Sequence, residues 1–373
     1  LSWFYEKSGG PTVDGVIAVN ASVLERLLAV LGPVEMENYG VTLTAENFIE
    51  KTQREVEIDY DKEENKPKQI LSDLAPILLE RVTDAGRDDY MGIMTALYES
   101  FKVKDVQLWF RESDMQNDAV GFGWAGEIKA APGDYLQIVH TNIAGQKTDA
   151  VMEEAVDHST KILADGTAIV TLTIRRTHNG VKGALFSGVR NVDYLRVYVP
   201  LGSTLVEADG FESPDATLFE LPEAGYEPDP IIAEREAGET IDRRSGTRSS
   251  IENSKTVFSN WVQTDPGDTS EVTLIYQLPP SAIEMREPDD GPLASLYDNI
   301  TNSSNGVRLA YSLLVQKQSG SNPVTFTSSV DVPRGYHIIW EDPDHETDEL
   351  GKETANMTLD SDSFFSVVAE SAN

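Results

Sequence analysis

The sequence has 373 residues, of which 63 are Asp or Glu and 30 are Lys or Arg, so its formal net charge is −33. A surface this acidic repels the phosphate backbone of nucleic acids and anionic lipid headgroups, so we expect no nucleic-acid partner. The chain contains no cysteine, which excludes disulfides and thiolate metal sites.

The length predicts two or three domains, and the 40% of hydrophobic residues is enough to build folded cores. No run of apolar residues approaches the ~20 that a membrane-spanning helix needs. The chain starts without Met, inside an apolar, helix-like stretch at residues 1–5. We interpret this start as a cut within a domain, so that any membrane anchor would precede residue 1.

Residues 1 to about 115 predict an α/β arrangement. Ser22 followed by Glu25 has the spacing of a helix capping box. The fourth expected helix, which Asp88 should cap, has apolar residues at helical spacing: Tyr90, Met94, Leu97, Tyr98 and Phe101. The expected elements are a strand at 13–19, helices at 22–31, 44–49, 70–78 and 88–101, and a strand at 106–110.

Beyond the glycine-rich segment 121–126 the hydrophobic period changes from 3.6 to 2. Val170, Leu172 and Ile174 alternate with polar residues, and later segments repeat this strand pattern. The predicted fold is therefore a partial α/β domain followed by an all-β part. We expect the α/β part at 1–130, and two tandem β-sandwich modules of immunoglobulin-like type at 131–283 and 284–373.

Five sequence segments resemble a bacterial family called domain of unknown function 4012. They are SWFYEKSGGP at 2–11, VDGVIAVN at 13–20, YDKEENKPK at 60–68, GWAGEI at 123–128 and LRVYVP at 195–200. The resemblance implies an extracytoplasmic protein of the bacterial cell surface, held by an N-terminal membrane helix. It also implies that about half of the α/β domain lies upstream of Leu1. The biochemical role of that family is not settled.

The strand at 13–19 and the helix at 22–31 also resemble a unit of the LytR–CpsA–Psr ligases. Those enzymes transfer glycopolymers from polyprenyl pyrophosphate to the cell wall. The segment LTAE at 43–46 resembles the start of a helix in that family. The resemblance implies that the upstream half supplies acidic residues this chain lacks, so we assign no catalytic residue and expect no transfer by this chain alone.

The same resemblance places a phosphate-binding group at Arg54, Lys66, Lys68 and Gln69. Gln53 stands where those ligases have an arginine, and lysines replace arginines in the later cluster. Lysine lacks the bidentate phosphate geometry of arginine. The cluster is interleaved with acidic residues, so it predicts either a solvated face of mixed charge or a pyrophosphate site completed by the upstream half.

An acidic stretch near the C-terminus partly matches a calcium-binding loop. The candidate ligands are Asp342, Asp344, Glu346, Asp348 and Glu353. Glu353 stands at position 12, which is the bidentate glutamate of an EF-hand loop, but Thr347 occupies the position that requires glycine. Calcium is the one cofactor the sequence indicates, and an acidic hairpin loop is the alternative.

Two functions remain open. The first is a structural or interaction role at the cell envelope, with the upstream half of the α/β domain, another copy or another surface protein as partner. The second is binding or transfer of polyprenyl-pyrophosphate-linked glycopolymers by the completed α/β domain. In both, contact with the membrane comes only through the missing N-terminal anchor.

Overall fold

The computed structural model describes residues 1–220, 225–227, 229–286, 306–342, 346–347 and 353–372. These residues form two compact units, unit 1 (Leu1–Glu127) and unit 2 (Ile128–Asn373). The division falls three residues before the expected end of the α/β part at residue 130. Each unit is described by itself.

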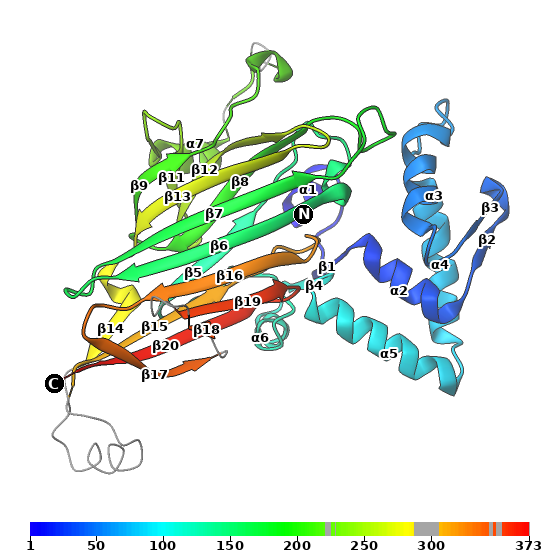
Figure 1. The fold of residues 1–373 in the computed structure, drawn as a ribbon. Coiled ribbons are helices and arrows are strands. Elements are labelled where there is room, and N and C mark those ends of the chain that lie inside the picture. Colours follow the sequence, from blue (N-terminus) through cyan, green and yellow to red (C-terminus); the bar gives the residue numbers. More distant parts are fainter. Residues whose placement is uncertain (221–224, 228, 287–305, 343–345, 348–352, 373) are drawn as a thin grey trace. The chain divides into compact units, whose positions relative to one another are not determined.

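Unit 1 combines helices with two short strand pairs (Figure 1). Its strands are β1 (Gly15–Val19), β2 (Val34–Met36), β3 (Val41–Leu43) and β4 (Val106–Phe110). Its α-helices are α1 (Ser2–Lys7), α2 (Ala21–Leu31), α3 (Phe48–Arg54), α4 (Gln69–Thr83), α5 (Arg87–Lys102) and α6 (Ser113–Gly121). In the described chain β1 pairs only with β4, and β2 pairs only with β3.

Asp105 joins the start of α2 to the start of β4. Its carboxylate accepts hydrogen bonds from Asn20, Ser22 and Arg26 at 2.9, 2.7 and 2.7 Å. Burial acts to raise the pKa of Asp105, but these bonds outweigh burial and hold it below its ordinary value. The predicted capping by Ser22 is wrong, because α2 begins at Ala21 and the Ser22 hydroxyl donates to Asp105 instead.

Two small hydrophobic clusters form the core of unit 1, and α2 contributes to both. One contains Leu28, Val34, Met36, Leu43, Phe48, Ile70, Leu74 and Leu78. The other contains Val23, Leu27, Ile93, Ala96 and Val106. The amphipathic pattern at 22–31 thus predicted a real helix, and the apolar residues of this helix pack into both clusters.

The expected apolar stripe of α5 is only partly correct. Ile93 and Ala96 are its buried apolar residues, whereas Tyr90, Met94 and Tyr98 are exposed. The helix begins at Arg87 after Gly86, so Asp88 is not its cap. Because α5 is apolar on more than one side, the sequence spacing alone did not identify the buried side.

Unit 2 consists mainly of two large sheets, with one described α-helix, α7 (Pro230–Ala237). Sheet 1 has the strand order β10 (Thr240–Ile241), β11 (Arg248–Glu252), β12 (Lys255–Thr264), β8 (Asn191–Pro200), β5 (Asp134–Val139), β15 (Arg308–Val315), β20 (Ser363–Ser371) and β17 (Tyr336–Asp342), with β14 (Ile283–Arg286) also paired to β15. Sheet 2 has the order β18 (Glu346–Thr347), β19 (Glu353–Leu359), β16 (Val324–Asp331), β6 (Met152–Ile162), β7 (Ala168–His178), β13 (Thr269–Gln277) and β9 (Thr204–Asp209).

The expected boundary at residue 284 does not separate two sets of strands. Strand β5 pairs in parallel with β15, and β6 pairs in parallel with β16, which runs beside it in Figure 1. Both sheets therefore contain strands from each expected module, and one hydrophobic cluster contains residues of both sheets. A period of 2 identifies a strand and its buried face but not its partner, so tandem modules were the wrong arrangement.

Candidate functional site

The β1–β4 pair has a register that fixes which backbone groups point outward. Arg111 N–H donates to Asp14 O, and Asn20 N–H donates to Asp105 O, both at 2.8 Å. Paired residues alternate between bonded and non-bonded positions in an antiparallel ladder. It follows that the N–H and C=O groups of Val16 and Ala18 point toward β4, whereas those of Gly15, Ile17 and Val19 point away from it.

The two outer edges of this pair differ. On β4, Leu108 N–H donates to Trp124 O and Phe110 N–H donates to the side chain of Gln116, both at 2.8 Å. On β1, no described residue pairs with the outward groups of Gly15, Ile17 and Val19. The outer edge of β1 is therefore open, and we call these three residues the β1 edge.

The side chains of the β1 edge are also uncovered. Ile17 is 66% exposed and Val19 is 51% exposed. Their cross-strand partners on the same face, Leu108 and Val106, pack against the helices. The helices of unit 1 therefore cover the β4 half of this face and leave the β1 half in solvent.

A groove of about 450 Å³ lies beside the β1 edge. Val16, Ile17, Phe110 and Met115 provide apolar walls. Arg111 lies at the groove, where its guanidinium donates to Val13 O at 3.0 Å and to Glu6 at 3.0 Å. Apolar side chains next to unpaired backbone groups match the way sheets bind added strands.

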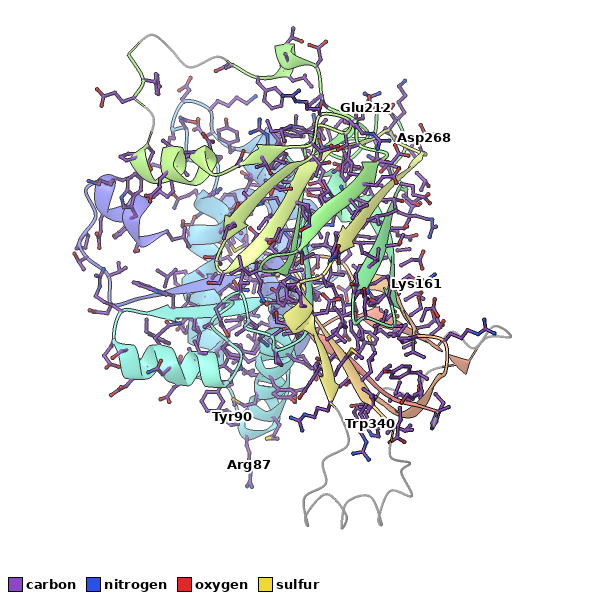
Figure 2. The ribbon with its side chains drawn as sticks, turned by 90° about the vertical axis from the view of Figure 1, so that its left-hand side faces the viewer. Arg87, Tyr90, Lys161, Glu212, Asp268 and Trp340 are labelled. Atoms are coloured by element: carbon purple, nitrogen blue, oxygen red, sulfur yellow. The ribbon has the colours of Figure 1, made fainter. Side chains whose placement is uncertain are left out.

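The outer side of α5 is a second uncovered apolar surface in unit 1. Tyr90, Met91, Met94 and Tyr98 are all exposed, and three of them are spaced four residues apart along the helix. Figure 2 shows Tyr90 projecting from the first turns of α5, next to Arg87. An exposed apolar cluster of this kind indicates an interaction surface.

The four predicted phosphate-binding residues are exposed, and all except Lys68 contact a nearby acidic side chain. Arg54 pairs with Asp59 at 2.9 Å, and Lys66 pairs with Glu64 at 3.4 Å. Gln69 donates to Asp73 at 2.7 Å. Among the described residues, no hydrogen bond or ion pair links any two of Arg54, Lys66, Lys68 and Gln69, so a phosphate site there stays a prediction.

The predicted calcium loop falls largely outside the described side chains. Asp342 is the last residue of β17, and Glu346 and Glu353 lie in the paired strands β18 and β19. Asp344 and Asp348 lie outside the described residues. No group of three or more acidic or histidine side chains suited to a metal ion occurs in the part of the chain that the structure describes.

Unit 2 contains a buried charged cluster that the sequence analysis did not identify. Asp193 of β8 binds Arg176 of β7 at 2.8 Å and His140, just after β5, at 2.7 Å. Glu154 of β6 binds the other ring nitrogen of His140 at 2.7 Å. We call these four residues the charged cluster. It joins the two sheets, because β5 and β8 belong to sheet 1 whereas β6 and β7 belong to sheet 2.

The electrostatics of the charged cluster keep His140 protonated at neutral pH. Burial alone would lower its pKa, but the carboxylates of Glu154 and Asp193 raise it to about 9. Arg176 is 4% exposed. Because Arg176 and His140 are both occupied by carboxylates, we assign the cluster to fixing structure rather than to acid–base chemistry.

A further polar group lies between the sheets, around Asp134. Tyr311 donates to Asp134 at 2.8 Å and lies 2.9 Å from the Thr160 hydroxyl. His158 lies 3.6 Å from the same carboxylate and 3.4 Å from the Tyr276 hydroxyl. Burial raises the pKa of Asp134 to about 7 and lowers the pKa of His158 to about 3, so both are neutral near pH 6.

One sequence signal could have revealed the charged cluster. Arg176 follows Val170, Leu172 and Ile174 in steps of two, so it occupies the buried phase of β7. A charged residue in the buried phase of a strand needs charged partners, because an unpaired buried charge is too costly. The pattern could not name His140 or Asp193 as those partners, because they come from other strands.

Residues 2–56 match the model of a family described as "Protein of unknown function (DUF4012)". This match confirms the resemblance expected for the start of the chain. No curated protein matches the sequence. Among the described helices, none combines the length and apolar character needed to cross a membrane.

Among solved structures, an M1 zinc metallopeptidase from Deinococcus radiodurans is similar at 13% identity, with a TM-score of 0.25. A two-domain M1 zinc metallopeptidase variant bound to L-tryptophan is similar at 13% identity, with a TM-score of 0.26. Both similarities cover 59% of this chain and less than half of the other protein, 42% and 43% respectively. TM-scores this low do not establish a shared fold.

Proposed function

We propose that this chain is an interaction protein whose unit 1 binds an extended polypeptide strand at the β1 edge. The observation that carries this proposal is the row of outward backbone groups on Gly15, Ile17 and Val19, which have no described partner. An added strand would pair with these groups and cover Ile17 and Val19. Unprotected edges are otherwise sites of uncontrolled aggregation, which natural proteins avoid.

The proposed occupant is a strand with apolar residues at alternate positions, from the upstream half of the same α/β domain. A two-stranded sheet is too small to cover several amphipathic helices. The exposed apolar side of α5 supports the same conclusion, because further elements of an α/β domain would bury it. A second copy of the chain is the competing occupant, and the tests below distinguish the two.

The proposed setting is the bacterial cell surface, outside the cytoplasm, with attachment through an N-terminal membrane anchor. The match of residues 2–56 supports it through the family resemblance. The acidic, cysteine-free composition is compatible with it. In this setting the chain serves as a structural or interaction component of the cell envelope.

Polyprenyl-pyrophosphate binding by the completed domain is the second proposal. It rests on the resemblance of residues 13–46 to the ligases and on the exposed lysines Lys66 and Lys68. Charge reversal at both lysines in the natural protein should abolish binding of a polyprenyl pyrophosphate analogue. Undiminished binding would leave these lysines as part of a solvated face.

The substitution Ile17→Lys tests the β1 edge. In the 373-residue chain alone it should change the free energy of unfolding by no more than about 0.5 kcal/mol, because Ile17 is 66% exposed there. In the natural protein isolated from its cells, the same lysine would lie against a paired strand and should destabilise unit 1 by about 2 kcal/mol or more.

Ile251→Lys is the matched control, because Ile251 is 67% exposed in strand β11 of unit 2. It should have a small effect in both proteins. Equal, small effects of Ile17→Lys in both proteins would overturn the proposal. A concentration-dependent dimer of the 373-residue chain that Ile17→Lys dissociates would identify a second copy as the occupant.

A further inference from the structure

Lys255 occupies an unusual position in unit 2. It is the first residue of β12, directly after Asn253 and Ser254, whose φ angles of 49° and 59° are typical of a tight two-residue hairpin turn. Lys255 is 6% exposed. Its ammonium nitrogen lies 3.7 Å from the centre of the Tyr135 ring.

The ammonium group of Lys255 has the carboxyl group of Asp134 nearby but is not directly paired with it. It forms no hydrogen bond or ion pair with any residue in the described ranges. Glu252, its partner across the hairpin, is engaged by the Tyr198 hydroxyl at 2.7 Å and by Arg196 at 3.5 Å. Arg176, which is also buried, is by contrast surrounded by carboxylates.

Most of the Lys255 side chain is buried, but its ammonium nitrogen, which lies over the Tyr135 ring, stays in reach of solvent and therefore of an added ligand. Burial lowers the pKa of Lys255, and the nearby charge of Asp134 opposes that shift. An acceptor supplied from outside the chain would satisfy the N–H donors that the protein leaves free.

A cavity of about 380 Å³ lies at Lys255. Residues 128–133 form one wall, and Leu201, Pro279 and the turn at Asn253 and Ser254 form the others. This volume falls within the range of small-molecule sites. We call it the Lys255 cavity.

We propose that the Lys255 cavity binds a small organic oxyanion, either a carboxylate or a phosphate ester. The ammonium of Lys255 donates to the anionic oxygens, the Tyr135 ring holds the ammonium in place, and Leu201 and Pro279 contact the apolar body of the ligand. This site lies entirely in unit 2, so it does not depend on the proposed role of the β1 edge.

The test compares the melting temperature in acetate, benzoate, inorganic phosphate and glycerol phosphate with that in chloride, at constant ionic strength. A ligand that binds only the folded state stabilises it, so at least one oxyanion should raise the melting temperature by about 2–4 °C. Benzoate should act more strongly than acetate, and glycerol phosphate more strongly than inorganic phosphate, because each adds a body that the cavity walls can contact. The two chemical series separate carboxylate from phosphate recognition.

Lys255→Met should abolish that rise, and Lys255→Arg should retain it. Lys161→Met is the matched control at an exposed lysine at the end of β6, labelled in Figure 2, and it should leave the rise unchanged. The NMR signals of the Tyr135 ring should shift when the anion binds, which provides a second readout. The proposal is wrong if no oxyanion stabilises the wild-type chain, or if Lys255→Met responds as the wild type does.

Discussion

Units 1 and 2 differ in how far their polar groups and apolar surfaces are paired or covered within the chain. Unit 2 buries charged and polar side chains between two large sheets and provides partners for Arg176, His140 and Asp134 within the chain. The described part of unit 1 has two sheets of two strands each, an open β1 edge and an uncovered apolar side of α5. We propose from this difference that the outward groups of unit 1 are arranged for a partner, whereas these buried groups of unit 2 are already paired within the chain.

Removal of Asp193 should give the largest change in unfolding free energy, and this change should be confined to unit 2. Asp193→Ala leaves Arg176 and His140 buried with too few carboxylates, so unit 2 should lose about 3–5 kcal/mol of unfolding free energy. Urea unfolding followed by amide exchange of the unit 2 strands measures this loss. Asp265→Ala, at an exposed ion pair with Arg190, is the control and should cost less than about 1 kcal/mol.

The charged cluster should also make unit 2 sensitive to alkaline pH. The folded pKa of His140 is about 9, above its ordinary value of 6.5, so the stability it contributes is complete below pH 6.5 and is lost as pH rises to 9. The loss should be on the order of 3 kcal/mol. His140→Gln should flatten the unfolding free energy between pH 7 and 9, and an unchanged slope would contradict this account.

Asp134 and His158 should have opposing pH effects that cancel in the native chain. The raised pKa of Asp134 lowers stability as pH rises from 4 to 7, and the lowered pKa of His158 lowers stability as pH falls from 6.5 to 3. Between pH 4 and 6.5 the pair carries one proton in both the folded and the unfolded state. Its net contribution should therefore be independent of pH in this range.

Single substitutions should separate these two effects. Asp134→Asn should make unit 2 lose stability toward pH 4, whereas His158→Gln should make it lose stability toward pH 6.5, each by about 1.4 kcal/mol per pH unit. Denaturant titrations at several pH values measure both slopes. Slopes of the same sign would show that the two side chains do not titrate as described.

Substitution of exposed apolar residues of unit 1 should give the smallest change in the unfolding free energy of the isolated chain. Met94→Ser and Tyr98→Ser should each change the unfolding free energy by no more than about 0.5 kcal/mol, because both side chains are exposed. They should, however, lower the binding of a dye that detects apolar surface. Leu74→Ala, in the core of the same unit, is the contrasting variant and should cost about 2–5 kcal/mol.

Local sequence patterns predicted most elements of unit 1 and many strands of unit 2. The apolar run at 13–19 became β1, and the alternation of Val170, Leu172 and Ile174 became the buried face of β7. These predictions hold because a helix or strand shows its period within a few residues.

Long-range pairing could not be predicted in the same way. The parallel pairs β5–β15 and β6–β16 join segments more than 150 residues apart, and no local pattern specifies them. The charged cluster was missed for the same reason, since its four residues come from separate segments. The β1 edge was partly anticipated, because two strands were too few for the helices beside them.

Amide exchange at Ile17 and Val19 tests the central claim most directly. In the 373-residue chain alone, these outward amides should exchange at nearly the rate of an unstructured peptide, whereas Val16 and Ala18, which face β4, should be protected. In the natural protein isolated from its cells, a paired strand should slow exchange at Ile17 and Val19 by about 100-fold or more. Protection in the isolated chain that increases with its concentration would instead indicate pairing with a second copy. Fast exchange at both residues in the natural protein would contradict the proposal that the β1 edge binds a strand.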